Sequence, residues 1–178
     1  ALANFVGIGI SGGADDIIGG GTPNKRNIIS GNTYAGIMAA GTNISIQGNY
    51  IGFGADGATI IPNGTGVQIQ GTGTLGGDLP DERNVISNNQ TGVTLGEDEV
   101  GNSAMIVKGN FIGTNITGEF ARGNNSAGIN IGSAGHRIEN NVISSNGTTG
   151  ISITSIAGVS LSTNNVITGN KIGTDVSG

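Results

Sequence analysis

Cysteine and tryptophan are absent from this sequence of 178 residues, and proline occurs only 3 times. The lack of cysteine excludes disulfides, zinc–thiolate sites and thiol nucleophiles. Aromatic residues make up 3% of the chain, so the stacking platforms that usually hold sugars are scarce. Apolar runs are only a few residues long, far below the roughly 20 that cross a bilayer, and no membrane span is expected.

Charge is also scarce, because Lys, Arg, Asp and Glu together make up 11% of the residues and the net charge is −5. The 7 basic residues are scattered along the chain, and without a basic stripe we expect no nucleic-acid partner. Glycine is abundant, with 36 copies. The glycines do not follow the strict three-residue repeat of collagen, so a collagen-like fold is excluded. The hydrophobic content of 35% argues against a disordered linker.

Three short sequence words recur through the chain. The word GNxIG stands at 48–52, 109–113 and 169–173, and it alternates with the word NxIS at 27–30, 84–87 and 141–144. A third word consists of glycine, an aliphatic residue, any residue and a second aliphatic residue. It begins each of six units, at 7, 36, 66, 92, 128 and 150, and the copy at 36 matches the pattern less well. The units are 22 to 36 residues apart, and the alternation of words makes the true period a pair of about 60 residues.

Each unit contains three short stretches in which apolar residues alternate with others, as strands require. Gly and Asn interrupt every window before a helical stripe can extend. The sequence therefore predicts an all-β fold, a parallel β-helix (β-solenoid) with about six rungs of three short strands, in three pairs of about 60 residues. Inward positions include Ile44 and Ile46, and we expect residues 1–178 to be one domain that belongs to a longer repeat array.

Asparagine recurs at one corner of every predicted rung. Gly and Asn tolerate positive φ better than other residues, and an Asn amide can bond to the equivalent amide in the next rung. These corner residues are interpreted as structural: Asn27, Asn49, Asn84, Asn110, Asn141 and Asn170. Several Asn-x-Ser/Thr triplets, including those at Asn63, Asn89, Asn124 and Asn146, are attributed to chance in a chain of this composition.

The combination of these words resembles the right-handed parallel β-helix repeats of the pectin-lyase-like group, found in large bacterial extracellular and surface proteins. The resemblance implies right-handed coiling and a secreted or cell-surface location. It covers nearly the whole chain but does not select a function, because the group contains polysaccharide lyases, hydrolases, epimerases, tailspikes and adhesins.

Chemical sites are expected where the repeat pattern breaks. Glu97, Asp98 and Glu99 cluster in one turn and are weak candidate ligands for Ca²⁺, although a charged surface loop without metal is favoured. Asp15 and Asp16 form an acidic pair that we interpret as a solvated turn rather than as catalytic carboxylates. No catalytic residue and no cofactor other than Ca²⁺ is expected.

The remaining breaks are the only histidine and two long loops. His136 precedes a predicted strand and is expected to lie on the surface. The loops 53–65 and 114–127 should carry side-chain-capped turns at Asp56 and Asn115, as should Asp175 in the last unit. Tyr50, Phe111 and Lys171 share one repeat slot, which should therefore face outward.

Three hypotheses for function remain open. The first is a non-catalytic structural or adhesive module that extends, displays loops or self-assembles at a cell surface. The second is a part of a polysaccharide-acting lyase, hydrolase or epimerase, with carbohydrate as the partner. The third is a filament-forming subunit, since uncapped solenoid ends can contact further rungs or copies of the same chain.

Overall fold

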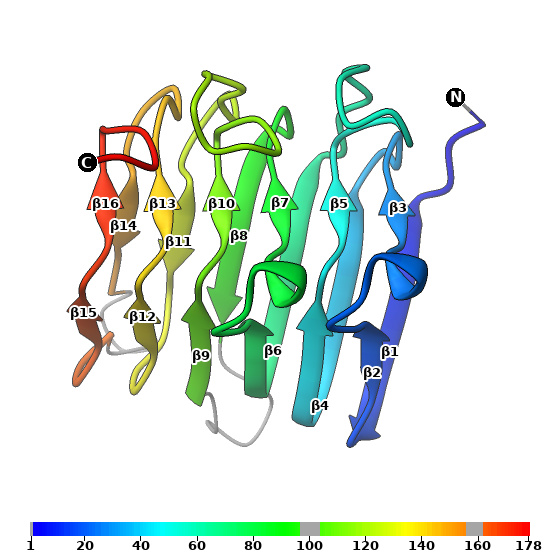
Figure 1. Cartoon of the computed structure of the whole chain (residues 1–178). Coiled ribbons are helices and arrows are strands. Elements are labelled where there is room, and N and C mark those ends of the chain that lie inside the picture. The colour runs from blue at the N-terminus through cyan, green and yellow to red at the C-terminus, as the bar shows by residue number, and fades with distance from the viewer. Residues whose placement is uncertain (1, 97–103, 156–161) are drawn as a thin grey trace.

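The chain winds into a β-solenoid with three faces, shown by a computed structural model that describes residues 2–96, 104–155 and 162–178 (Figure 1). The first face contains β1 (Val6–Ala14), the first halves of β4 (Ala35–Gln47) and β6 (Thr65–Gly76), β8 (Thr91–Gly96), β11 (Ile129–Ile131) and β14 (Ile151–Ile153). The second contains β2 (Ile17–Gly19), the later halves of β4 and β6, β9 (Ala104–Lys108), β12 (Arg137–Glu139) and β15 (Val166–Thr168).

The third face holds both alternating words in one column. Its strands are β3 (Ile28–Ile29), β5 (Tyr50–Ile51), β7 (Val85–Ile86), β10 (Phe111–Ile112), β13 (Val142–Ile143) and β16 (Lys171–Ile172). All pairings between the strands of the three faces are parallel. Six strands stacked in this sheet correspond to about five turns of the solenoid, which confirms the predicted fold class.

The coil is right-handed. In Figure 1 the strands nearest the viewer run upward and those behind run downward while the chain advances from right to left. This is the usual hand for crossovers between parallel strands. No α-helix occurs in the described residues; two short 3-10 helices, η1 (Pro23–Lys25) and η2 (Pro80–Glu82), lie in the insertions that precede β3 and β7. The described helices are too short to span a bilayer.

Three strands, β1, β4 and β6, are much longer than the short strands that the sequence predicted. β4 and β6 extend over 13 and 12 residues because their backbone stays paired while it bends from the first face to the second. The bend coincides with glycines, since the register between the two strands shifts between Gly41 and Ile44. A side chain at Gly71, which has φ 130°, would overlap the carbonyl of Gly41 in the neighbouring rung.

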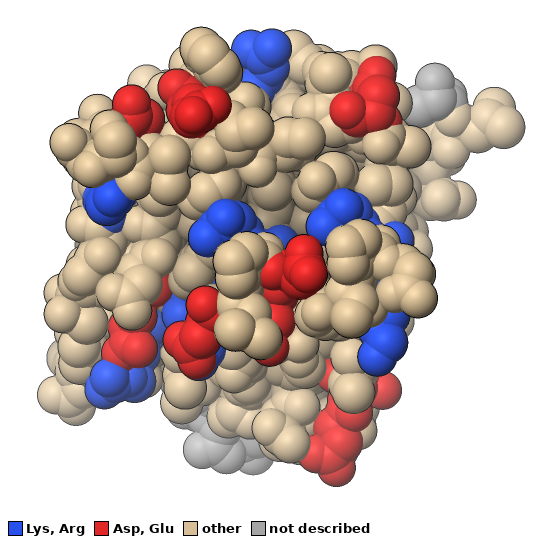
Figure 2. Space-filling model, viewed as in Figure 1, with Lys and Arg blue, Asp and Glu red and all other residues tan. Residues whose placement is uncertain are grey.

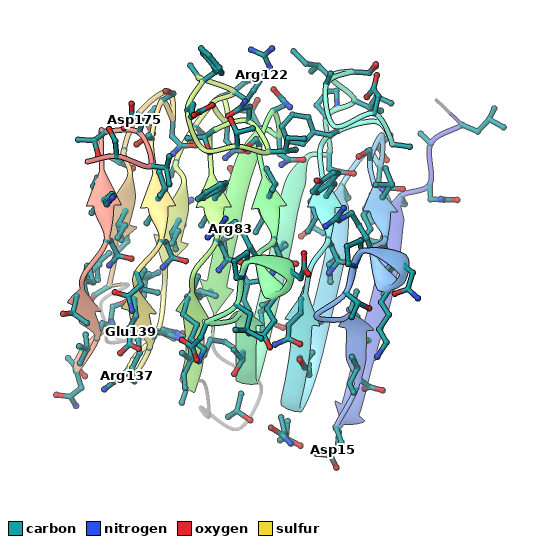
Figure 3. All side chains as sticks on the ribbon, viewed as in Figure 1. Asp15, Arg83, Arg122, Arg137, Glu139 and Asp175 are labelled. Atoms are coloured by element: carbon teal, nitrogen blue, oxygen red, sulfur yellow. The ribbon has the colours of Figure 1, made fainter. Side chains whose placement is uncertain are left out.

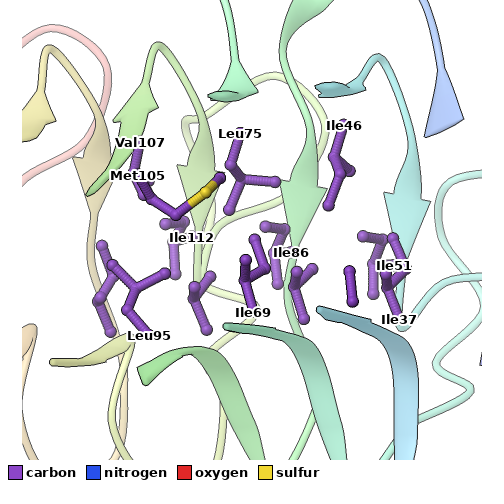
Figure 4. Packing of buried hydrophobic residues seen from close by; sticks show 14 of the residues in the cluster. Ile37, Ile46, Ile51, Ile69, Leu75, Ile86, Leu95, Met105, Val107 and Ile112 are labelled. Carbon is purple, nitrogen blue, oxygen red and sulfur yellow. The ribbon is translucent and has the colours of Figure 1, made fainter. Parts of the chain in front are cut away.

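Columns of aliphatic side chains fill the interior (Figure 4). Ile46, Leu75 and Val107 follow one another from rung to rung, as their strand registers require. Ile44 and Ile46 are fully buried, as predicted. Because each inward side chain packs against its equivalents about 4.8 Å above and below, the core is one continuous apolar column along the axis.

Candidate functional site

The corner that leads into the third face carries a continuous ladder of six asparagines. In each step the backbone N–H and the side-chain Nδ2 of one Asn both donate to Oδ1 of the Asn in the next rung, at 2.9–3.2 Å. We call it the first ladder, and its members in order are Asn27, Asn49, Asn84, Asn110, Asn141 and Asn170. The Nδ2 of Asn84 also donates to the carbonyl of Ile46 in the preceding rung at 2.8 Å, so each inner amide ties three successive rungs together.

The ladder asparagines do not themselves adopt positive φ, contrary to the reason given for them from the sequence. The left-handed conformation belongs to the residue before: Gly48 has φ 71°, Gly109 has φ 66° and Asn140 has φ 54°. Before Asn27 and Asn84, a 3-10 helix makes the turn instead. The ladder residues are therefore selected for their amide groups and not for backbone freedom.

A second ladder, which the sequence analysis missed, stands at the corner between the third face and the first. It repeats the same two-donor pattern at 2.8–3.2 Å, and its members are Asn32, Asn63, Asn89, Asn124 and Asn146. Asn4 extends it at the N-terminal end, with its Nδ2 at 3.4 Å from Oδ1 of Asn32. A signal was present, because each of these asparagines lies three or four residues before the glycine that opens the aliphatic word.

Serines of the NxIS word connect each rung to its partner in the pair. The hydroxyl of Ser30 donates to the carbonyl of Phe53 at 2.7 Å, and that of Ser87 donates to the carbonyl of Thr114 at 2.8 Å. The same oxygens accept backbone N–H groups from the GNxIG word, at Gly52 and Gly113, at 3.1 and 3.0 Å. These bonds run only between an NxIS rung and the GNxIG rung that follows, which gives the 60-residue period a physical basis.

His136 is buried, so the prediction of a surface histidine is wrong. Its Nδ1 accepts the backbone N–H of Met105 at 3.1 Å, and its Nε2 lies 2.8 Å from the hydroxyl of Ser133. The backbone N–H of His136 donates to Oδ1 of Asn165 in the next rung at 2.9 Å. The imidazole therefore occupies a corner slot as a neutral acceptor, and burial lowers its pKa from 6.5 to about 4.

The acidic pair lies at the first turn of the chain, where Asp15 caps a neighbouring corner. Asp15 is exposed at φ 59°, and its Oδ1 accepts a hydrogen bond from Nδ2 of Asn43 at 2.7 Å. Figure 3 shows it at the edge of the solenoid opposite to Arg122 and Asp175. Among the described residues no group of three His, Asp or Glu side chains is placed to hold a metal ion. Glu97, Asp98 and Glu99 lie outside the described residues, and Ca²⁺ binding there stays a prediction.

The long loops fold around side-chain caps, as the repeats predicted. Oδ1 of Asp56 accepts the N–H groups of Ala58 and Thr59 at 3.0 and 2.9 Å, and the bonds from Thr59, its hydroxyl first, lower the pKa of Asp56 to about 2. In the second loop, Oδ1 of Asn115 accepts the backbone N–H of Phe120 at 3.1 Å. The hydroxyl of Ser177 lowers the pKa of Asp175 in the equivalent turn.

The slot of Tyr50 and Phe111 faces outward from the main core, as predicted, but arginine side chains cover both rings. Phe111 is only 3% exposed. The guanidinium of Arg83 lies 3.9 Å from its ring centroid, and Nε of Arg83 donates to the carbonyl of Gly109 at 3.0 Å (Figure 3). Arg26 covers Tyr50 in the same way, at 4.2 Å. Burial lowers the pKa of Arg83. The two rings belong to a second, smaller core outside the third face, which is formed by Phe53, Val85, Phe111 and Val142 with Tyr50 packed against them.

Charge is mixed over the face that carries these pairs. Figure 2 shows basic side chains across the middle of this face with acidic side chains close to them. The exposed apolar side chains of the long loops include Ile60 and Phe120, which are 58% and 64% accessible. The first rungs also carry an open hollow of about 820 Å³ on the first face, bordered by Met38, Ala40 and Gln70 and without ionisable lining.

The dominant chemistry of the described residues is thus neutral amide hydrogen bonding between rungs. No family model, curated protein or solved structure matches this chain.

Proposed function

We propose that this chain is a structural β-solenoid module of a secreted or cell-surface protein, which serves as a stiff spacer and presents the loops 53–65 and 114–127. The observation that carries the proposal is the pair of asparagine ladders that run from the first rung to the last. A buried amide left without a partner costs about 1–3 kcal/mol. Because every inner ladder amide exchanges hydrogen bonds with the rungs above and below it, any slip or bend between rungs would break several such bonds together.

The placement of the long loops supports a presenting role. Both loops leave the GNxIG rungs of the third face, so they project from the same side at intervals of two rungs, or about 10 Å. Their turns are held by Asp56 and Asn115, while Ile60 and Phe120 remain exposed at the loop surfaces. A rigid column that holds variable loops at a fixed spacing suits a module whose partners bind the loops.

The stiffness can be measured with two nitroxide labels on cysteines placed at Ile17 and Val166. These positions share one column on the second face, five rung steps apart, which corresponds to about 24 Å. Both side chains are exposed, and the chain has no cysteine of its own. A spacer predicts one narrow distance distribution that 1 M urea leaves unchanged. A broad distribution in buffer would overturn the proposal.

The competing enzymatic function is tested separately. The protein is incubated with uronate-rich and neutral polysaccharides, with and without Ca²⁺, and new reducing ends and unsaturated products are measured. A structural module predicts no turnover above a heat-denatured sample. Turnover that survives repeated purification would replace the structural proposal with a polysaccharide-acting enzyme.

A further inference from the structure

Both Asn–Gly dipeptides of this sequence lie in the second ladder, at Asn63–Gly64 and Asn146–Gly147. In such a dipeptide the backbone nitrogen of the glycine can attack the side-chain amide carbon of the asparagine and close a succinimide ring. This ring closes most readily at Asn–Gly, because glycine has no side chain to hinder the attack and its backbone reaches the required angles. The second ladder therefore contains the two asparagines of the chain that are most prone to deamidation.

Packing fixes both members of the first dipeptide. A Cβ at residue 64 would lie 2.3 Å from the carbonyl oxygen of Tyr34 and 2.8 Å from that of Thr33 in the neighbouring rung, so only glycine fits there. Residue 63 must be asparagine, because its side chain both accepts and donates in the ladder and no other side chain of that length offers both functions. The labile dipeptide is thus a requirement of this corner.

The folded corner holds both reacting groups in other hydrogen bonds. Asn63 is 3% exposed, and its Oδ1 accepts the backbone N–H and Nδ2 of Asn32 at 3.0 and 2.9 Å. Its Nδ2 donates to Oδ1 of Asn89 at 2.8 Å and to the carbonyl of Ile29 at 3.0 Å. The attacking group, the N–H of Gly64, donates to the carbonyl of Asn32 at 3.1 Å. Ring closure would have to break the bonds of both groups first.

We propose that Asn63 is a latent self-modification site, which the folded ladder keeps inactive and which reacts when the chain unfolds. In the unfolded chain the nitrogen of Gly64 loses its proton to solvent base and forms a bond to Cγ of Asn63. The bond from Cγ to Nδ2 breaks, and the nitrogen leaves as ammonia. Water then opens the succinimide at either carbonyl and gives aspartate or isoaspartate, so the net reaction consumes one water and releases one ammonia. This inference goes beyond the spacer function and does not depend on a binding partner.

The product cannot replace asparagine in the ladder. An aspartate at residue 63 would present a second oxygen, in place of Nδ2, to the amide oxygen of Asn89 and the carbonyl of Ile29. A carboxylate has no donor for these two acceptors, and its charge would be buried beside them. Isoaspartate would also lengthen the backbone by one methylene and move Gly64 out of register. A chain that has reacted cannot rebuild this corner, and its unfolding becomes irreversible.

Incubation of the folded and the unfolded chain tests the gating. The unmodified protein is kept at pH 8 in buffer or in concentrated urea, and peptide mapping by mass spectrometry follows the conversion of Asn63 to aspartate and isoaspartate. A site that opens only when the chain unfolds is slowed by the unfolded fraction, so we expect conversion at least about 100-fold slower in buffer. Equal rates in the two conditions, or no conversion in urea, would overturn the proposal.

Two alanine variants in one rung separate protection by the ladder from global stability. Asn89→Ala removes the oxygen that accepts from Nδ2 of Asn63, whereas Asn84→Ala makes the equivalent change toward Asn49 in the first ladder. Both asparagines are fully buried. Rates in buffer are corrected for the unfolded fraction of each variant, which urea titration gives. Asn63 should then react about tenfold faster in Asn89→Ala, because a hydrogen bond that opposes local opening is lost. Equal corrected rates would contradict protection by the ladder.

The aspartate product can also be introduced by mutation. Asn63→Asp should fail to refold from urea, or refold with a clearly lower urea midpoint, because it places the carboxylate in the ladder from the start. Asn125→Asp changes an exposed asparagine beside the ladder, and as the matched control it should refold like the unmodified chain. An unchanged midpoint for Asn63→Asp would contradict the irreversible step, since the ladder would then tolerate the product.

Discussion

The amide oxygen of Asn110 accepts both the backbone N–H and the side-chain Nδ2 of Asn84, at 3.1 and 3.0 Å. Asn84 in turn accepts the same two groups from Asn49. One side chain thereby satisfies a corner in two rungs at once, and the corner remains fully bonded although Asn84 is completely buried.

Replacement of Asn84 by alanine should destabilise the fold by about 2–4 kcal/mol. The change leaves the backbone N–H of Asn49 and the carbonyl of Ile46 buried without these partners, and each unsatisfied group costs about 1–3 kcal/mol. Urea denaturation measures the effect. Asn170→Ala is the matched control, because the Nδ2 of Asn170 donates to no further ladder amide in the described chain and the residue is partly exposed. Equal losses for the two variants would contradict the ladder argument.

The final glycine of the GNxIG word should respond to alanine according to its rung. A Cβ at Gly113 would overlap the carbonyl of Ser144 in the next rung, whereas a Cβ at Gly173 meets nothing within 4 Å. Both residues have positive φ, at 91° and 83°, so backbone strain of about 1 kcal/mol is common to both. Gly113→Ala should therefore lower the thermal midpoint clearly more than Gly173→Ala, and a reversed order would show that the rungs repack freely.

Acid should weaken the fold through His136. Its folded-state pKa of about 4 lies below the unfolded value of 6.5, so the native state binds fewer protons than the unfolded one. This contribution to stability is complete well above pH 6.5 and declines as the pH falls toward 4, by about 1 kcal/mol at pH 5.5 and about 3 kcal/mol at pH 4.5. Below pH 4 this contribution is lost.

The variant His136→Asn isolates that contribution from the titration of carboxylates. Asparagine retains an acceptor for the corner but does not titrate in this range. Urea denaturation of both proteins at pH 7.5, 5.5 and 4.5 should give a smaller decline for the variant. Parallel declines would mean that His136 is not the group responsible.

Arg83→Lys should cost about 1 kcal/mol although it conserves the charge. Lysine has no Nε–H that can reach the carbonyl of Gly109 while a planar group stacks on Phe111. Arg122, whose guanidinium bonds the neighbouring carbonyl of Ala121 on an exposed loop, provides the control, and Arg122→Lys should be neutral. Thermal unfolding of the two variants decides between a structural and a merely surface role for Arg83.

Much of the scaffold could be predicted because its requirements repeat. Ile44 and Ile46 alternate with polar residues, so their burial follows from the two-residue period of a strand. The recurrence of Asn84 and Asn110 at equivalent corners indicated the first ladder. The two-rung period was visible because the serine of NxIS, such as Ser87, serves only the rung that follows it.

The failures arose where one position depends on a neighbour far away in the sequence. His136 was placed on the surface because local sequence does not show that Met105, 31 residues earlier, needs an acceptor. For Phe111 only an outward direction was predicted, because the local sequence does not show that Arg83, from an insertion in the preceding rung, covers the ring. The second ladder was overlooked because four of its asparagines, Asn63, Asn89, Asn124 and Asn146, also begin Asn-x-Ser/Thr triplets, which were attributed to chance in a chain of this composition.

The confinement of the serine bonds to alternate junctions has a consequence for how such a chain changes length in evolution. A tandem duplication or deletion of about 60 residues would leave each serine with its acceptor and each ladder with its next amide. Gain or loss of a single unit would place two NxIS rungs or two GNxIG rungs in succession. A serine hydroxyl of the NxIS word would then lack its partners in a following GNxIG rung. Recombination between gene segments should therefore lengthen or shorten the solenoid by whole pairs of rungs.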